Sequence, residues 1–194
     1  MRKFKRICVY CGSSNKPAPV YFEAARAVGR MLAERQIAVV YGGGSTGLMG
    51  AVADGALEHS GQVYGVIPDK LRALELGHGK LTELFVVDSM HARKTVMAQL
   101  SDGFMALPGG FGTLEEIFEV TTWTQLNYHK KPAGLLNVEG YFDGLLAFLA
   151  HARQSGFIRP EHASLLCSAS TPEALLEALA TAEIPELAKW IDNP

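Results

Sequence analysis

Short apolar runs alternate with longer segments of helical periodicity along this chain. Strands are expected at 6–11, 37–41, 62–67, 84–87, 104–107, 133–138 and 165–167. Helices are expected at about 20–35, from the loop at 42–50 to about 59, from about 90, from about 113 to 126, over 141–154, from 171, and at 184–191. This alternation predicts an α/β, Rossmann-like three-layer fold with a mostly parallel central sheet and helices on both faces, forming a single domain over residues 1–194.

Glycine-rich loops follow three of the expected strands. Gly12 and Ser13 follow the first, Gly43 and Gly44 lie in the loop at 42–50, and a Pro-Gly-Gly turn begins at 108. In a parallel sheet these loops emerge at one edge, and glycine lets an anion approach the amides at the start of a helix. Neither the dinucleotide fingerprint nor the Walker pattern is complete, so a mononucleotide site fits better.

Two adjacent carboxylates and two adjacent cations carry the candidate chemistry. Glu116 has two interpretations: it forms a capping box with Thr113, or it acts on a ligand held by the loop at 108–113. Arg93 and Lys94 fall in the first turn of a helix, where cations oppose the helix dipole, so they are either solvated surface residues or binders of a nearby anion. The strand order implied by the alternation lets Arg93 and Glu116 meet across one crevice.

Composition excludes several classes of function. The formal net charge of −2 argues against general affinity for nucleic acid or anionic membrane, and no apolar run is long enough to span a bilayer. The three cysteines are too few for a disulfide scaffold and fit the cytoplasm. Cys8 and Cys11 sit three apart on a strand and therefore face opposite sides of the sheet, which disfavours a metal or redox pair. The six histidines show no paired metal-ligand spacing, although His78 and His91 are expected near the mouth of the site.

Motifs distributed along most of the chain resemble the Lonely Guy (LOG) family, the cytokinin-activating phosphoribohydrolases. They are the glycine loop at 42–50, the Met-His-Ala-Arg-Lys sequence at 90–94, the segment 108–116, which fits the family pattern PGGxGTxxE, and the sequences at 122–126 and 131–132. The resemblance implies hydrolysis of the N-glycosidic bond of an adenosine 5′-monophosphate, N6-modified in the cytokinin case, to free base and ribose 5-phosphate. It implies no metal and no cofactor.

The resemblance also assigns roles to residues. Arg93 and Glu116 are the expected catalytic pair, with Glu116 stabilising positive charge on the ribose ring. The expected substrate-binding set is Gly12, Ser13, Gly43, Gly44, Glu75, Lys94, Gly109, Gly110, Gly112, Thr113, Leu114, Glu115 and Thr122. Within it, the glycines of the 109–112 turn and Thr113 are expected to hold the 5′-phosphate.

Family membership further implies a homodimer, often with a site completed across the interface. Relatives have often been labelled lysine decarboxylases, but nothing here resembles a lysine committed to pyridoxal phosphate. Two other interpretations remain open from the sequence. One is a nucleotide-binding sensor or carrier without hydrolysis, and the other is base exchange or cleavage of a 2-deoxyribonucleotide.

Overall fold

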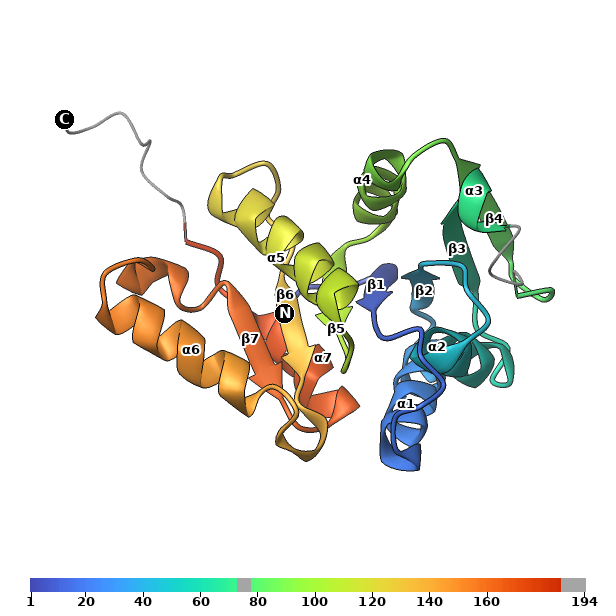
Figure 1. Ribbon diagram of the computed structural model, residues 1–194, viewed down its shortest axis with the longest axis horizontal. Helices are drawn as coiled ribbons and strands as arrows, with labels where there is room; N and C mark the ends of the chain where they lie inside the picture. Colours follow the sequence, from blue (N-terminus) through green and yellow to red (C-terminus); the bar gives the residue numbers. More distant parts are fainter. Residues whose placement is uncertain (73–77, 186–194) are drawn as a thin grey trace.

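A seven-stranded, entirely parallel sheet forms the centre of the molecule (Figure 1). The structure is a computed structural model and describes residues 1–72 and 78–185. The strands lie in the order β4-β3-β2-β1-β5-β6-β7. Their bounds are β1 Arg6–Tyr10, β2 Ala38–Tyr41, β3 Val63–Pro68, β4 Glu83–Val87, β5 Gly103–Ala106, β6 Ala133–Leu136 and β7 Leu166–Ala169. The predicted sheet is confirmed, with every described strand parallel to its neighbours.

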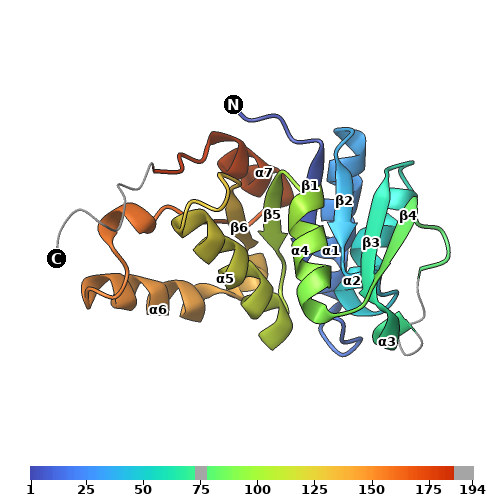
Figure 2. The same cartoon turned by 90° about the horizontal axis from the view of Figure 1, so that it is seen from above.

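Helices cover both faces of this sheet. One layer is made by α1 (Pro19–Glu34), α2 (Gly47–Leu57) and α7 (Pro172–Thr181), and the other by α4 (Met90–Leu100), α5 (Phe111–Gln125) and α6 (Asp143–Gln154). Figure 2 shows α4, α5 and α6 side by side in front of the sheet. The short helix α3 (Asp69–Arg72) follows β3 directly. The predicted three-layer α/β fold is confirmed.

Two apolar cores, one on each face, hold the layers together. The central strands β1, β2 and β5 are buried almost throughout, which explains their continuous apolar character. Cys11 packs in the core beneath α1 and α2, whereas Cys8 packs in the core beneath α4 and α5. The two thiols therefore face opposite sides of the sheet, as predicted, and all three cysteines are free.

The strand order reverses direction beside β1, and this reversal positions the site. The chain moves outward from β1 through β2 and β3 to β4, then returns to place β5 on the other side of β1. The loops after β1 and β5 consequently lie next to each other, and the Gly12 amide donates to the Pro108 carbonyl over 3.1 Å. An open parallel sheet binds ligands at such a crevice.

Local sequence signals predict the starts of two helices correctly, but they also predict a terminal helix that the described residues do not show. Ser89 Oγ caps α4 by accepting from the Ala92 amide at 3.1 Å, and Thr171 Oγ1 caps α7 by accepting from the Ala174 amide at 3.3 Å. The terminal helix expected at 184–191 is absent from residues 182–185, and the rest of it lies outside the described residues. None of the described helices is both long and apolar enough to cross a membrane.

Candidate active site

Arg93 projects from the first turn of α4 into the space below the loop that follows β2. Its Nη2 donates to the Gly42 carbonyl at 3.0 Å, and the residue is only 8% exposed. A Cβ on Gly42 would lie 1.9 Å from that nitrogen, so only glycine admits the guanidinium here. Arg93 Nε is also buried and has no hydrogen-bond partner in the described chain. A buried guanidinium with an unused donor is available to a ligand.

Lys94 is held between two carboxylates of α5. Its Nζ donates to Glu115 Oε1 at 2.5 Å and to Glu119 Oε1 at 3.0 Å. Burial by itself would lower the pKa of Lys94, but the hydrogen bonds to Glu115 and Glu119 outweigh it and raise the pKa. Lys94 is therefore a fixed ammonium that ties α4 to α5 and brings one more positive charge close to Glu116.

Glu116 is the perturbed carboxyl group of the site. Burial raises its pKa from 4.5 to about 7, with Arg93 acting in the opposite direction and Glu115 adding to the rise. Within the described part of the chain, Glu116 makes no hydrogen bond and no ion pair within 4.0 Å, although its pKa responds to Arg93. The two groups thus interact through their charges without a direct bond, and Glu116 changes charge near neutral pH.

The capping-box interpretation of Glu116 is wrong because α5 begins earlier than that motif requires. The N-cap is Gly110 with no side-chain cap, and the Leu114 amide already donates to the Gly110 carbonyl at 3.1 Å. Thr113 is therefore the third residue of the helix and cannot serve as its N-cap, the position that a capping box requires for the threonine. Glu116 is left without a structural task in the helix start.

The loops after β1 and β5 touch each other at Gly12 and Gly109, and the contact leaves no room for a side chain at Gly109. A Cβ on Gly109 would lie 2.1 Å from Thr113 Oγ1 and 2.9 Å from the Gly12 amide nitrogen. By contrast, nothing lies within 4 Å of the Cβ position of Gly110 or Gly112. The turn is packed on the side of Gly12 and open where α5 starts, which leaves the first helical amides accessible to an anion.

A pocket of about 340 Å³ adjoins this turn. Gly12, Ser13, Gly109 and Gly110 contribute to its wall, which brings four of the expected binding residues to one cavity. The loop after β1 is also held by α2, since the Leu48 amide donates to the Gly12 carbonyl at 2.9 Å.

The remaining glycines and Leu114 are placed further from the cavity. Gly43 adopts φ +80°, and its Cβ position lies 3.3 Å from Ile67 and from Leu84, so it packs toward β3 and β4. Gly44 is buried in the same loop, and Leu114 packs on the core beneath α4 and α5. These three residues shape the loops and the helix start around the site.

Two expected binding residues are not brought to Arg93 and Glu116. Thr122 is exposed, donates to the Phe118 carbonyl at 2.7 Å and lines a separate groove between α5 and α6. Glu75 lies outside the described residues.

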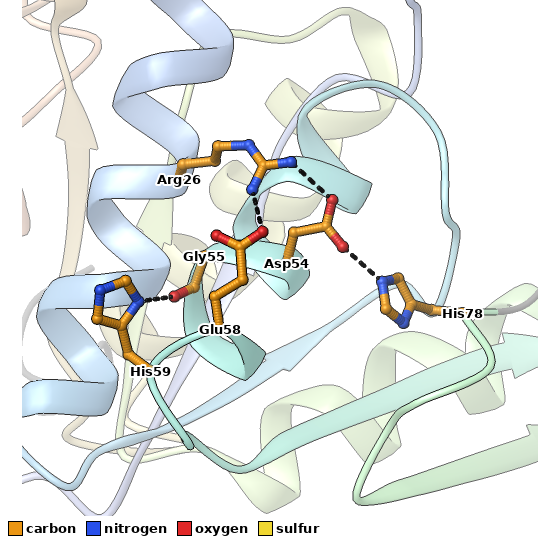
Figure 3. A network of polar contacts seen from close by, with 6 residues as sticks. All are labelled: Arg26, Asp54, Gly55, Glu58, His59 and His78. Atoms are coloured by element: carbon orange, nitrogen blue, oxygen red, sulfur yellow. Dashed lines mark hydrogen bonds and ion pairs between the residues drawn. The ribbon is translucent and has the colours of Figure 1, made fainter.

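His78, expected near the mouth, is bound to α2. Its Nε2 lies 2.8 Å from Asp54 Oδ1, and Arg26 bridges Asp54 and Glu58 at 3.0 and 2.7 Å (Figure 3). This network attaches the segment before β4 to the helical layer of α1 and α2. The carboxylates of Asp54 and Glu58 have partners within this network, whereas His78 Nδ1 is buried without a hydrogen-bond partner in the described chain.

Three residues near the site were missed at the sequence level. Gly42 was read only as part of a glycine run, although the approach of Arg93 makes it indispensable. Glu119 follows Glu115 by four residues, so helical spacing alone could have placed both beside Lys94. Tyr141 donates to the Gly109 carbonyl at 2.7 Å from a loop far along the chain, and no local pattern indicates it.

Comparison with known proteins gives a consistent family assignment. A family model described as possible lysine decarboxylase matches residues 49–179. Cytokinin riboside 5'-monophosphate phosphoribohydrolase LOG7 of Arabidopsis thaliana is 50% identical over 178 residues, covering 91% of this chain and 82% of that protein. The probable cytokinin riboside 5'-monophosphate phosphoribohydrolase LOGL2 of Oryza sativa subsp. japonica is 48% identical over 177 residues, covering 91% of this chain and 72% of that protein.

Two solved structures with the same fold are of proteins that have a different described role, which is to bind or carry the molybdenum cofactor. The molybdenum cofactor binding protein of Rippkaea orientalis is 25% identical with a TM-score of 0.68, covering 91% of this chain and 95% of that one. The molybdenum cofactor carrier protein of Chlamydomonas reinhardtii is 21% identical with a TM-score of 0.66, covering 92% of this chain and all of that one, which establishes likeness of fold alone.

The identity of 48–50% to the plant proteins, over 91% of this chain, decides between these likenesses. The chain belongs to the Lonely Guy (LOG) family of cytokinin riboside 5′-monophosphate phosphoribohydrolases.

Proposed function

We propose that this protein hydrolyses the N-glycosidic bond of adenosine 5′-monophosphates, including N6-modified ones, to free base and ribose 5-phosphate. The observation that carries the proposal is the half-buried Glu116, whose pKa is raised to about 7 and responds to the charge of Arg93, on the helix that starts at a glycine turn open to an anion. The activity for which the Arabidopsis and rice relatives are named supports the same reaction, since these proteins are about half identical to this chain.

Glu116 acts on the ribose ring in this scheme. As the bond from the anomeric carbon to the base nitrogen breaks, positive charge develops on the ring, and an ionised carboxylate nearby lowers the energy of that state. The oxygen of a water molecule then bonds to the anomeric carbon, and a proton of the water is transferred to the departing base. Because Glu116 is poised to ionise near neutral pH, the carboxylate form is available under ordinary conditions.

Arg93 binds and orients the substrate opposite Glu116. Its Nε has no partner in the described structure and its Nη1 donates only to the Met90 sulfur, at 3.8 Å, whereas the contact to the Gly42 carbonyl fixes the plane of the group. A planar guanidinium held in this way makes directional, charge-assisted hydrogen bonds to substrate oxygens. Removing either Arg93 or Glu116 should therefore impair the reaction more than removing any one binding group.

The glycine turn binds the 5′-phosphate. The first amides of α5 lack acceptors within the helix, and the helix dipole adds favourable potential for a dianion at this end. The Thr113 hydroxyl, packed against Gly109, adds a further donor. This arrangement explains a preference for the monophosphate over the nucleoside, because the nucleoside cannot use these donors.

Lysine decarboxylation, suggested by the family description, does not fit the lysine of this site. A lysine that forms a Schiff base must lose its proton, but the two carboxylates around Lys94 raise its pKa and hold the ammonium. We assign Lys94 a supporting role, in which it positions α5 and moderates the charge on Glu116.

We also propose a homodimer formed through the groove between α5 and α6. This groove has a volume of about 300 Å³ and a mostly apolar lining that includes Phe118, Leu146 and Leu149, while nearby Phe148 is 62% exposed. Thr122 lies at its wall, so a partner subunit would approach the residue that the family pattern connects with substrate. Light scattering should give a mass of twice 21.0 kDa for the protein and a lower mass for Leu149→Asp.

The free, buried thiols suit a cytoplasmic location.

The test of the activity is base release by the purified protein. Adenosine 5′-monophosphate and its N6-isopentenyl derivative are incubated beside the nucleosides and triphosphates, and free base and ribose 5-phosphate are quantified. Release from the monophosphates in equal amounts of base and sugar phosphate, lost in Arg93→Ala, supports the proposal. The 2′-deoxy monophosphate, run in parallel, measures whether the ribose 2′-hydroxyl is required.

Binding without cleavage would identify the other candidate. The fold shared with molybdenum cofactor binding and carrier proteins makes a non-hydrolytic carrier the natural second function for this scaffold. If the monophosphate binds and no base is released over many hours, the hydrolase proposal fails and the carrier function takes its place.

A further inference from the structure

The loop between β6 and α6 carries an unusual backbone that the reaction scheme does not use. Glu139, at φ 50° and ψ 30°, and Gly140, at φ 69°, adopt left-handed conformations in succession. For a non-glycine residue this conformation costs about 1 kcal/mol or more, so the surrounding contacts must hold it. A strained loop that is held by its contacts presents its side chains in fixed positions.

Asn137 fixes this loop from both sides. Its Oδ1 accepts from the Phe142 amide at 2.7 Å, and its Nδ2 donates to Asp143 Oδ1 at 2.7 Å. A Cβ on Gly140 would lie 2.5 Å from Asp143 Oδ2, so the turn closes tightly over that side chain. The result is a rigid bracket around the one residue between Gly140 and Phe142.

That residue is Tyr141, and it reaches the Pro-Gly-Gly turn. Its hydroxyl donates to the Gly109 carbonyl at 2.7 Å. Its ring is supported by Tyr21, with centroids 5.8 Å apart at 73°, and by Phe142, with centroids 4.9 Å apart at 86°. Both Tyr141 and Tyr21 line the 340 Å³ pocket beside the turn. The strained loop thus places a supported phenol on a single backbone carbonyl.

Holding this carbonyl fixes the adjacent amide. The Gly109 carbonyl and the Gly110 N–H belong to one planar trans peptide unit and point in opposite directions. Gly109 and Gly110 carry no side chains, and Gly110 has nothing within 4 Å of its Cβ position, so packing alone does not restrain that unit at Gly110. The Tyr141 hydroxyl supplies the missing restraint and directs the Gly110 N–H away from the phenol.

We propose that Tyr141 is a positioning residue that sets the Gly110 amide for the 5′-phosphate and so contributes to selection of monophosphates over nucleosides. The inference rests on the proposed phosphate site. Tyr141 acts through the backbone of the turn, while the groups that face the ribose ring are on α4 and α5. Its loss should therefore affect phosphate binding and leave the step at the glycosidic bond nearly unchanged.

The test compares Tyr141→Phe with Tyr21→Phe. The first removes the hydroxyl that donates to the Gly109 carbonyl and keeps the ring, whereas the second removes the hydroxyl of the neighbouring tyrosine and likewise keeps its ring. Affinity for ribose 5-phosphate is measured by titration calorimetry, alongside KM and kcat for adenosine 5′-monophosphate. We expect Tyr141→Phe to weaken ribose 5-phosphate binding and to raise KM by about three- to tenfold, the range of one lost neutral hydrogen bond, with kcat within twofold. Tyr21→Phe should change neither quantity by more than twofold.

Asn137→Ala provides a second variant that leaves the phenol in place. It releases the bracket, so it should reproduce the weaker ribose 5-phosphate binding. Unchanged binding in Tyr141→Phe, or an equal loss in Tyr21→Phe, would overturn the inference even if the wild type hydrolyses monophosphates. Conversely, a wild type that binds ribose 5-phosphate and releases no base would defeat the proposed hydrolysis and leave Tyr141 testable by calorimetry alone.

Discussion

Replacing Glu116 with glutamine isolates its charge from its size. The substitution keeps the shape of the side chain and removes the negative charge from a half-buried position beside Arg93. Because no capping box forms at this helix start, the change removes no structural hydrogen bond from the described chain. Any effect on turnover therefore reports the carboxylate itself.

The expected loss of activity follows from the burial of the group. Opposite charges about 4 Å apart attract by about 1 kcal/mol in bulk water and by about 4 kcal/mol at an effective dielectric of about 20, as in a partly buried site. A ring cation that develops beside Glu116 should gain an amount nearer the second value. We expect kcat for Glu116→Gln to fall by about 10²- to 10³-fold, the range seen when one electrostatic stabiliser is removed.

The same burial predicts the direction of the stability change. A carboxyl pKa raised from 4.5 to about 7 means that ionising Glu116 is about 3 kcal/mol less favourable in the folded protein than in water. The folded state binds more protons than the unfolded state between these values, so stability from this group falls as pH rises through that window. At pH 8 the glutamine variant should be at least as stable as the wild type, and up to about 3 kcal/mol more stable.

The assay pairs the two measurements on one preparation. Free base is quantified at saturating monophosphate under multiple-turnover conditions, which gives kcat, and the free energy of unfolding is measured in urea at pH 8. A variant that retains more than a tenth of wild-type kcat refutes the catalytic role of the carboxylate. A variant that is inactive and clearly less stable at pH 8 refutes the account of its burial.

Four further outcomes follow from contacts in and near the site. The value of kcat/KM should fall about tenfold per pH unit below an apparent pKa near 7, because Glu116 must be ionised. Lys94→Met should move this limb to higher pH and Glu115→Gln to lower pH, since the first charge lowers and the second raises the Glu116 pKa. Gly42→Ala should lower kcat/KM at least tenfold, because its methyl group would displace a guanidinium nitrogen 1.9 Å away. Burial lowers the pKa of His129 to about 4, so its protonation should reduce stability as pH falls from 6.5 toward 4, and His129→Gln should flatten the melting temperature over that range.

Each of these outcomes has a matched comparison. Gly144→Ala adds a methyl group where nothing lies within 4 Å, so its activity should equal that of the wild type. Glu177→Gln removes an exposed carboxylate on α7 and should leave the acid limb in place. The melting series on His129 is run in the Glu116→Gln background, since Glu116 titrates over an overlapping range. Shifts of the acid limb in the same direction for both charge variants would contradict the electrostatic account.

Much of this architecture could be predicted because it depends on local pattern and on the geometry of parallel sheets. Continuous apolar runs identified the buried strands, and the common edge of their following loops placed Arg93 in reach of Glu116. The capping signal at Ser89 and at Thr171 was equally local and equally successful. These features follow from a few adjacent residues each.

The features that the sequence predicts wrongly or does not indicate depend on contacts between distant segments. The sequence at 113–116 satisfies a capping box, yet the glycines before it allow α5 to start at Phe111, and the motif falls inside the helix. The need for Gly42 exists only once α4 is docked against β2. Tyr141 reaches Gly109 across 32 residues through two left-handed backbone positions, which a sequence pattern does not reveal.

Helix α5 has a different neighbour on almost every side. Its buried positions, such as Ile117 and Val120, face the sheet, its glutamates meet α4, and Phe118 and Gln125 line the groove toward α6. An ordinary surface helix tolerates substitution in a repeating rhythm of 3.6 residues, with freedom on its solvent side. A saturation mutagenesis profile across 113–125, beyond the exposed Phe111 and Gly112, should lack that rhythm and show nearly uninterrupted constraint. In this family, the number of consecutive positions at which α5 does not tolerate substitution would indicate how many of its sides contact other elements.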